Sequence, residues 1–449
     1  MEGRGSRTEE LLEGKMDSTP GLDPISTRRQ KIAKLAREAR GLQFTTLAHH
    51  LDLAWMQAAL AATRKNGATG VDGMTAAEYA QGSEDRLRGL LERAKSGTYI
   101  APPVKRVYVP KDVKGQMRPI GIPTYEDKIL QRAVVMLLEP IYEQDFLPCS
   151  FGFRPGRSAH DALQALRNGL MEERCRWVVD VDIAQFFDSI DHRKLREILS
   201  KRVRDGVIVR LIGKWLNAGV LEKGEHSYPE EGTPQGGVIS PLLANIFLHE
   251  VVDAWVAREL RPRLGKVLLV RYADDLVIGV GSEAAAKEVL LRLGQRLEEY
   301  GLKLHPEKTR LVNLEPPWRN DNPDSFDFLG FTFYWGQSRK GNWVIRLKTA
   351  AKRLKRTITR IGAWARKQLH NPLREQQKGL NQKLMGHYGY FGITGNFRAL
   401  EQLFRVVVKV WKRWLGRRSQ RANWTWEKHA RMLEKYPLCK PRIVHRYGT

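Results

Sequence analysis

The chain has 449 residues, 42% of them hydrophobic, which is enough for two or three domains with a substantial core. No apolar run approaches the ~18–20 residues that span a bilayer, and the first twenty residues lack the hydrophobic segment of a secretory signal. We therefore expect a cytoplasmic protein without membrane contact. Three cysteines stand far apart with no CxxC pair, which argues against a zinc site or a disulfide framework: Cys149, Cys175 and Cys439.

The net charge of +26 is unevenly distributed along the chain. From Arg339 to Thr449 there are 28 Lys and Arg residues against four Glu, a net charge of +24, whereas the rest of the chain carries only +2. A stretch of this length and charge would repel itself without a polyanion, so the sequence predicts a nucleic-acid partner for it.

The predicted elements change character along the chain. Residues 1–25 show no periodicity and are expected to be a mobile tail, and residues 26–100 are expected to be helical. Residues 101–338 mix strands with helices. In the basic region 339–449, the segment 339–347 is hairpin-like and the rest reads as basic helices, so the fold class is α+β with a helical C-terminal domain. The expected helices are 27–40, 45–64, 76–96, 123–146, 192–203 and 282–301, the last with Ser282 as its N-cap, and the expected strands include 101–110, 176–183 and 326–335.

Two adjacent acids interrupt an apolar hairpin in "VLLVRYADDLVIGVGS" (residues 267–282). Asp274 and Asp275 stand between two short β-branched runs, each of which reads as a buried strand. Adjacent carboxylates repel each other, and a purely structural turn would more simply use Asn-Gly or Asp-Gly. The pair therefore calls for a further explanation.

A second acidic segment is "WVVDVDIAQFFDSIDH" (residues 177–192). Strand alternation places Asp180 and Asp182 on the face opposite to the valines between and beside them. Carboxylates gathered on strands are costly unless a cation neutralises them. Phosphoryl transfer uses such a cluster, because Mg²⁺ prefers carboxylate oxygens and two ions ~3.5–4 Å apart serve the attacking and leaving oxygens. If only one of these segments were present, its acids would more often be surface carboxylates that balance the charge of nearby Lys or Arg side chains.

Three further segments carry residues suited to a nucleotide. "PKDVKGQMRPIGIP" (110–123) places Lys111 and Arg118 around a turn, where they are suited to grip a triphosphate. "EGTPQGGVISPLLANIFL" (231–248) is a Gly/Pro loop that opens a helix, and "GLKLHPEKTRL" (301–311) carries Lys308 on a turn. Each of these segments is weak evidence alone.

Together and in this order, the segments resemble those of reverse transcriptases, and more narrowly the reverse transcriptase/maturases encoded by bacterial group II introns. The resemblance extends from about residue 40 to the C-terminus. It implies right-hand polymerase fingers and palm over 101–338 and a basic thumb and maturase-specific domain over 339–449. Further segments that carry it are "SFGFRPGRSAHDAL" (150–163), "FDFLGF" (326–331), "HYGYFGITGN" (387–396), "WKRWLGRRSQ" (411–420) and "PLCKPRIVHRYG" (437–448).

The resemblance also implies roles for individual residues. Asp182, Asp274 and Asp275 match the catalytic aspartates that hold two Mg²⁺ ions, with Asp274 the better ligand. Phe187 matches the ring that lies under the sugar and excludes a 2′-hydroxyl, and Phe186 is the weaker choice. Lys111 and Arg118 are expected to contact the triphosphate, and Gln235 is expected to lie near the nucleotide and the template. Lys308 is a candidate for contact with the pyrophosphate. The alternative for Lys308 is that it only lies on a solvated turn.

Two activities follow from the resemblance. One is RNA-directed DNA synthesis from dNTPs, with a target DNA strand as primer, that copies the intron RNA during retrohoming. The other is maturase action, in which the protein binds the intron RNA and assists its splicing. The alternative is a domesticated reverse transcriptase of a defence or diversity-generating system, which would not need the maturase-like tail. Since only six residues follow "YPLCKPRI" (436–443), we expect the endonuclease-less type, primed by a 3′-hydroxyl made by other means.

Overall fold

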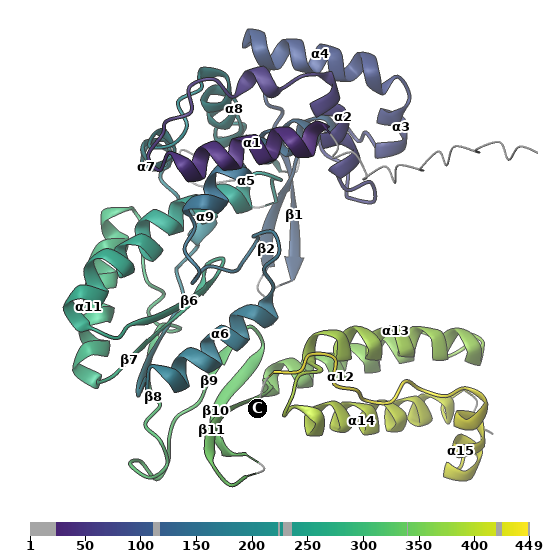
Figure 1. Cartoon of the computed structure of the whole chain (residues 1–449). Coiled ribbons are helices and arrows are strands. Elements are labelled where there is room, and N and C mark those ends of the chain that lie inside the picture. Colours follow the sequence, from purple (N-terminus) through teal and green to yellow (C-terminus); the bar gives the residue numbers. More distant parts are fainter. Residues whose placement is uncertain are drawn as a thin grey trace, which may run out of the picture.

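The computed structural model describes residues 24–110, 117–222, 225–227, 236–338, 340–418 and 424–447. Two of the predicted nucleotide contacts, Lys111 and Gln235, lie outside these residues, as does most of the predicted N-terminal tail. Figure 1 shows a helical layer at the top, strands through the middle and a separate group of helices at the lower right. The mixture of helices and sheets agrees with the predicted α+β class.

The N-terminal layer confirms the three helical patterns predicted before residue 100. The second pattern starts later than expected, because Asp52 accepts a hydrogen bond from the Trp55 N–H at 2.8 Å and caps the helix there. The third is broken at Gly82, whose φ of 70° no helix tolerates. The helices of this layer are α1 (Pro24–Glu38), α2 (Leu53–Ala62), α3 (Ala76–Ala80) and α4 (Ser83–Ser96), with a 3₁₀ turn at Ala48–His50.

This layer packs on α5 (Tyr125–Asp145), the long amphipathic helix predicted at 123–146. The buried indole of Trp55 donates from Nε1 to the Ala133 carbonyl at 3.0 Å, which fixes α2 against α5. Beside this contact lies a small sheet in the order β2-β1-β4-β5. Its strands are β1 (Val104–Pro110), β2 (Met117–Ile122), β4 (Val220–Glu222) and β5 (Glu225–Ser227).

A four-stranded antiparallel sheet, which we call the central sheet, has the order β6-β7-β3-β8. Its strands are β6 (Leu268–Tyr272), β7 (Asp275–Val280), β3 (Trp177–Val181) and β8 (Arg310–Asn313). On one face Val179 and Val181 join the core with α11, and on the other Val178 joins the core with α6. The predicted alternation in β3 is confirmed. The other helical elements of this part of the chain are α6 (Ala159–Glu172), α7 (His192–Ser200), α8 (Gly206–Leu216), α9 (Ser240–Leu248), π-helical turns at His249–Asp253 and Val256–Leu260, α10 (Arg261–Leu264) and α11 (Glu283–Glu299). Of these, α8 lies beside α4 at the top of Figure 1.

A third sheet, with the order β11-β10-β9, leads into the C-terminal helices. The change from strand to helix comes between Thr349 and Ala351, directly after the segment 339–347 that was predicted to be hairpin-like. The helices have an apolar core of their own, in which Trp411 is buried. The elements are β9 (Phe326–Phe328), β10 (Phe331–Gln337), β11 (Trp343–Thr349), α12 (Ala351–Lys367), α13 (Leu373–Phe391), α14 (Phe397–Leu415) and α15 (Trp426–Lys435). In the described part of the chain, no helix has the length and apolar character needed to cross a membrane.

Candidate active site

The predicted catalytic acids come together at one end of the central sheet. Tyr272 pairs with Asp275 across the β6–β7 hairpin, so Ala273 and Asp274 form its two-residue turn. The β3–β7 register pairs Val181 with Leu276, and Asp182, the next residue, therefore lies opposite Asp275. Segments almost a hundred residues apart in sequence thus deliver carboxylates to the same place.

The acids affect one another electrostatically. Displacement of water by the surrounding protein and repulsion from Asp274, Asp182 and Asp180 raise the pKa of Asp275 to about 7. The pKa of Asp274 is also raised, by burial first and by Asp182 among its neighbours. The side chain of Asp275 stays exposed to solvent, and its place opposite Asp182 and next to Asp274 accounts for the repulsion. A cation would relieve that repulsion, and carboxylate oxygens suit Mg²⁺.

Residues near Lys308 hold Asp182 in place through hydrogen bonds and an ion pair. The Asp182 carbonyl accepts hydrogen bonds from the His305 N–H at 2.8 Å and from the Thr309 hydroxyl at 3.2 Å. Lys308 Nζ lies 3.3 Å from each carboxylate oxygen of the same aspartate. The structure therefore places Lys308, a predicted site residue, beside the acids, where it forms an ion pair with Asp182. Among the described residues, no three His, Cys, Asp or Glu side chains converge closely enough to hold a metal ion in this arrangement.

Asp180, the acid that sequence reasoning set aside, has a different partner. Arg310 Nε lies 3.1 Å from its Oδ2, on the neighbouring strand β8. This ion pair, and the contribution of Thr309 to Asp182, were not predicted. Their signal was the position of both residues directly after Lys308 in "EKTRL" (307–311), where β8 begins.

The two phenylalanines that follow β3 differ in exposure. Phe186 is only 2% exposed and belongs to the core, whereas Phe187 is half-buried. Their rings meet edge to face at 5.2 Å in a short 3₁₀ turn, Phe186–Asp188. Phe187 is therefore the ring of the two that a bound molecule can reach.

Arg118 faces the acids from the β2 strand. Its side chain is exposed, and its charge lowers the pKa of both Asp274 and Asp275 against the larger effects that raise them. A guanidinium in this position can bind the phosphates of a nucleotide that approaches the carboxylates.

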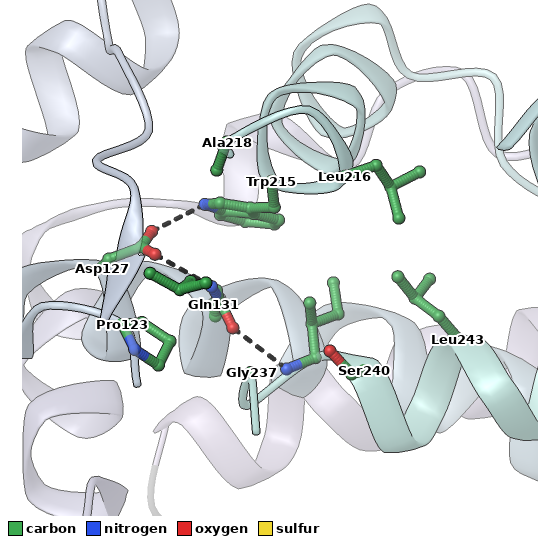
Figure 2. Close-up of a pocket in the computed structure, with 11 residues that line it drawn as sticks. Pro123, Asp127, Gln131, Trp215, Leu216, Ala218, Gly237, Ser240 and Leu243 are labelled. Atoms are coloured by element: carbon green, nitrogen blue, oxygen red, sulfur yellow. Dashed lines mark hydrogen bonds between the residues drawn. The ribbon is translucent and has the colours of Figure 1, made fainter. Parts of the chain in front are cut away.

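A buried polar cluster ties the elements behind the site together (Figure 2). Asp127, on α5, accepts three hydrogen bonds: from Tyr99 Oη at 2.5 Å, Trp215 Nε1 at 2.7 Å and Gln131 Nε2 at 3.0 Å. Gln131 in turn accepts the backbone N–H groups of Val238 and Ile239 at its Oε1, at 2.7 and 3.2 Å. Gln131 of α5 therefore holds the segment that leads into α9, and Trp215 of α8 joins the same network through Asp127.

The same segment touches β2. Gly236 has a φ of 122°, and a Cβ there would lie 2.4 Å from the Gly121 carbonyl oxygen, so only glycine fits. The strand that carries Arg118 and the segment that leads into α9 are thus held side by side. Sequence reasoning missed Asp127 and Gln131, and their signal was two polar residues one turn apart on the apolar face of the 123–146 helix.

Comparison with known proteins agrees with this geometry. The sequence profile of the family "Reverse transcriptase (RNA-dependent DNA polymerase)" matches residues 109–333. The chain is similar to protein YkfC of Escherichia coli, 35% identical over 303 residues that cover 61% of this chain and 77% of YkfC. It is also similar to the group II intron-encoded protein LtrA of Lactococcus lactis, 44% identical over 38% of this chain. A third relative is the mitochondrial nuclear intron maturase 2 of Arabidopsis thaliana, 29% identical over 30% of this chain. The aligned segments span 28% of LtrA and 24% of the Arabidopsis maturase.

Proposed function

The chain belongs to the reverse transcriptase family, among the relatives of group II intron-encoded proteins, and we propose that it copies its intron RNA into DNA during retrohoming and also assists the splicing of that RNA. The observation that carries the polymerase half is the meeting of Asp182 with Asp274 and Asp275 at one end of the central sheet. In this proposal the β2-β1-β4-β5 sheet belongs to the fingers, the central sheet to the palm and the C-terminal helices to the thumb.

The three aspartates are proposed to hold two Mg²⁺ ions, which supply activation of the primer 3′-hydroxyl and stabilisation of the leaving pyrophosphate. Arg118, together with Lys111, binds the triphosphate of the incoming dNTP. The exposed side of the Phe187 ring lies under the sugar and leaves no room for a 2′-hydroxyl. Lys308 balances the charge of Asp182 and then turns to the pyrophosphate side. The donor chemistry of the site supports this assignment, since its carboxylates are hard oxygen ligands.

The test of the polymerase proposal is extension of a DNA primer on an RNA template with dNTPs and Mg²⁺. The wild-type protein should extend the primer, and Asp274→Ala should lose activity on the order of 10²–10³-fold or more, because a group that stabilises transition-state charge is removed. A matched control is Asp324→Asn. The carboxylate of Asp324 accepts a hydrogen bond from the N–H of Asn313, at the opposite end of the central sheet. Wild-type protein that extends no primer on RNA would contradict the proposal.

The maturase half is supported by the surface of the C-terminal helices. The buried side of α14 packs into their core through Leu403, Val407 and Trp411. Exposed basic side chains follow one another on the other side of α14, at Arg398, Arg405, Lys409 and Arg413, and Arg417 lies just beyond the end of the helix. Regular spacing of positive charge along a helix suits the phosphates of a folded RNA. A domesticated reverse transcriptase would not require such a surface, so the intron role is favoured over that alternative.

A further inference from the structure

The turn that carries the acids has a strained residue at its start. Ala273 has a φ of 58°, a left-handed conformation that costs free energy for any residue with a Cβ. Ala273 is the first of the two turn residues between Tyr272 and Asp275. Two-residue hairpins with positive φ at this position usually have glycine there. Something outside the turn must therefore hold Ala273 in place.

A buried arginine lies directly behind this turn. Arg271 donates from one terminal nitrogen to the Ala273 carbonyl at 3.0 Å and to Asn245 Oδ1 at 2.9 Å. Its Nε and its other terminal nitrogen donate to the two carboxylate oxygens of Asp253, at 2.8 and 2.6 Å. The side chains of Arg271 and Asp253 are both 0% exposed. The rigid guanidinium fork thus fixes the Ala273 carbonyl relative to two helical segments.

Asn245 gives the turn a second support. It is 1% exposed on α9, and its Nδ2 donates to the Gly152 carbonyl at 2.7 Å. Gly152 packs so tightly on the turn that a Cβ there would lie 2.3 Å from the Ala273 nitrogen. The Phe151 N–H donates to the Arg271 carbonyl at 2.9 Å and the Arg271 N–H donates to the Cys149 carbonyl at 2.8 Å, so the two segments are joined through their backbones. Ala273 is therefore confined on its carbonyl side by Arg271 and on its nitrogen side by Gly152.

We propose that Arg271 and Asn245 are positioning residues that hold Ala273 in its left-handed conformation and so aim Asp274 and Asp275. The inference rests on the proposed polymerase function. A buried ion pair is seldom more stabilising than apolar residues of the same volume. The bond from Arg271 to the Ala273 carbonyl is a task that apolar residues would not perform, and it links the ion pair to the turn.

The test uses glycine at the strained position as a suppressor. Arg271→Lys keeps the charge beside Asp253 but loses the fork that reaches Ala273. We expect this variant to lower the single-turnover rate of dNTP incorporation by about tenfold or more, because misplacement of the reacting groups is costly. It should also weaken Mn²⁺ binding, measured by electron paramagnetic resonance. Ala273→Gly is the reference, and Arg271→Lys/Ala273→Gly should recover most of the rate and the Mn²⁺ affinity measured for Ala273→Gly, because glycine adopts positive φ without strain.

Asn396 provides the matched control. It is also 1% exposed and makes three hydrogen bonds, but these join Thr349 and Phe391, at the start of the C-terminal helices. Asn396→Ala should lower the unfolding temperature, and Ala273→Gly should not restore the stability of that variant. Asn245→Ala is the second test variant, and it decides the question if Arg271→Lys does not fold.

The outcomes separate this inference from the proposed function. If wild-type protein extends primers but Ala273→Gly rescues neither Arg271→Lys nor Asn245→Ala, the two residues only stabilise the core and the inference is wrong. Rescue of the unfolding temperature without rescue of the rate would also overturn it. If the wild-type protein itself incorporates no dNTP, the proposed function fails first.

Discussion

The ammonium group of Lys308 lies 3.3 Å from both carboxylate oxygens of Asp182. The pair is well exposed, with 56% of the Lys308 side chain accessible, so it adds little to the stability of the fold. Its importance is electrostatic, because the ammonium group contacts the carboxylate that is proposed to bind a metal ion. Lys308 and a divalent cation therefore compete for the same carboxylate.

This competition makes Lys308→Met informative. Without the ammonium group, Asp182 is free, and the Mg²⁺ concentration that gives half-maximal activity should fall. The KM for dNTP should rise about tenfold if Lys308 also binds the departing phosphates, since a charge-assisted hydrogen bond contributes roughly 1.5–3 kcal/mol. Both parameters come from steady-state extension assays. An unchanged KM for dNTP would leave Lys308 as a partner of Asp182 alone.

Phe187→Ala should admit ribonucleotides. Removal of the accessible ring opens space beneath the sugar, so the ratio of rNTP to dNTP incorporation should rise while the fold persists. Phe186→Ala is the control, because that ring is buried and its loss should cost roughly 3–5 kcal/mol of stability without a change in sugar selectivity. A selectivity change in Phe186→Ala instead would move the assignment to Phe186.

Neutralising the α14 surface should weaken RNA binding. We expect the combined substitution of Arg398, Arg405, Lys409 and Arg413 by Gln to lower affinity for the intron RNA. The slope of log affinity against log salt should become shallower by about one for each phosphate that the variant no longer neutralises. The control neutralises an equal number of basic side chains: Arg263 on α10 and Lys287, Arg292 and Arg296 on α11, all of them ion-paired with glutamates. In Figure 1, α11 lies on the other side of the central sheet from α14. Equal weakening in the two variants would mean that net charge alone, and not this helix, binds RNA.

Asp127 should make stability depend on pH. Burial raises its pKa from 3.8 to about 6, although hydrogen bonds from Tyr99, Trp215 and Gln131 oppose the rise. The folded protein thus binds the proton more tightly than the unfolded chain does, so the free energy of unfolding should fall as pH rises from about 4 to 6. The decrease should be on the order of 2–3 kcal/mol. Asp127→Asn should remove this part of the slope in denaturant titrations. An identical slope in the variant would show that other groups cause it.

The sequence predicted the parts of the fold that depend on neighbours along the chain. The 3.6-residue period of α5 and α11, the cap at Ser282 and the alternation of β3 are of this kind. Pairings between distant segments leave no period, so neither the parallel pairing of β1 with β4 nor the place of β8 beside β3 was predicted.

The residues of the candidate site also form two groups, those that the sequence pointed to and those that only the structure revealed. Asp182, Asp274 and Asp275 stood out because acids are unusual in apolar strands. Arg271 and Asn245 lay within the quoted segments, but their function depends on hydrogen bonds to residues far away in the sequence. A single buried polar residue gives no sign in the sequence of which partner it will find.

Asp182 on β3 and the Asp274 turn between β6 and β7 are proposed to form one catalytic site. The most direct test is a double-mutant cycle on the rate of single-turnover dNTP incorporation with an RNA template. We predict that Asp182→Asn and Asp274→Asn each lower the rate on the order of 10²–10³-fold. The double variant should be about as slow as the slower single variant, because residues that act as one unit are not additive. RNA affinity should stay near the wild-type value in all three. A near wild-type rate in either single variant, or rate reductions that multiply as for independent sites, would contradict the account.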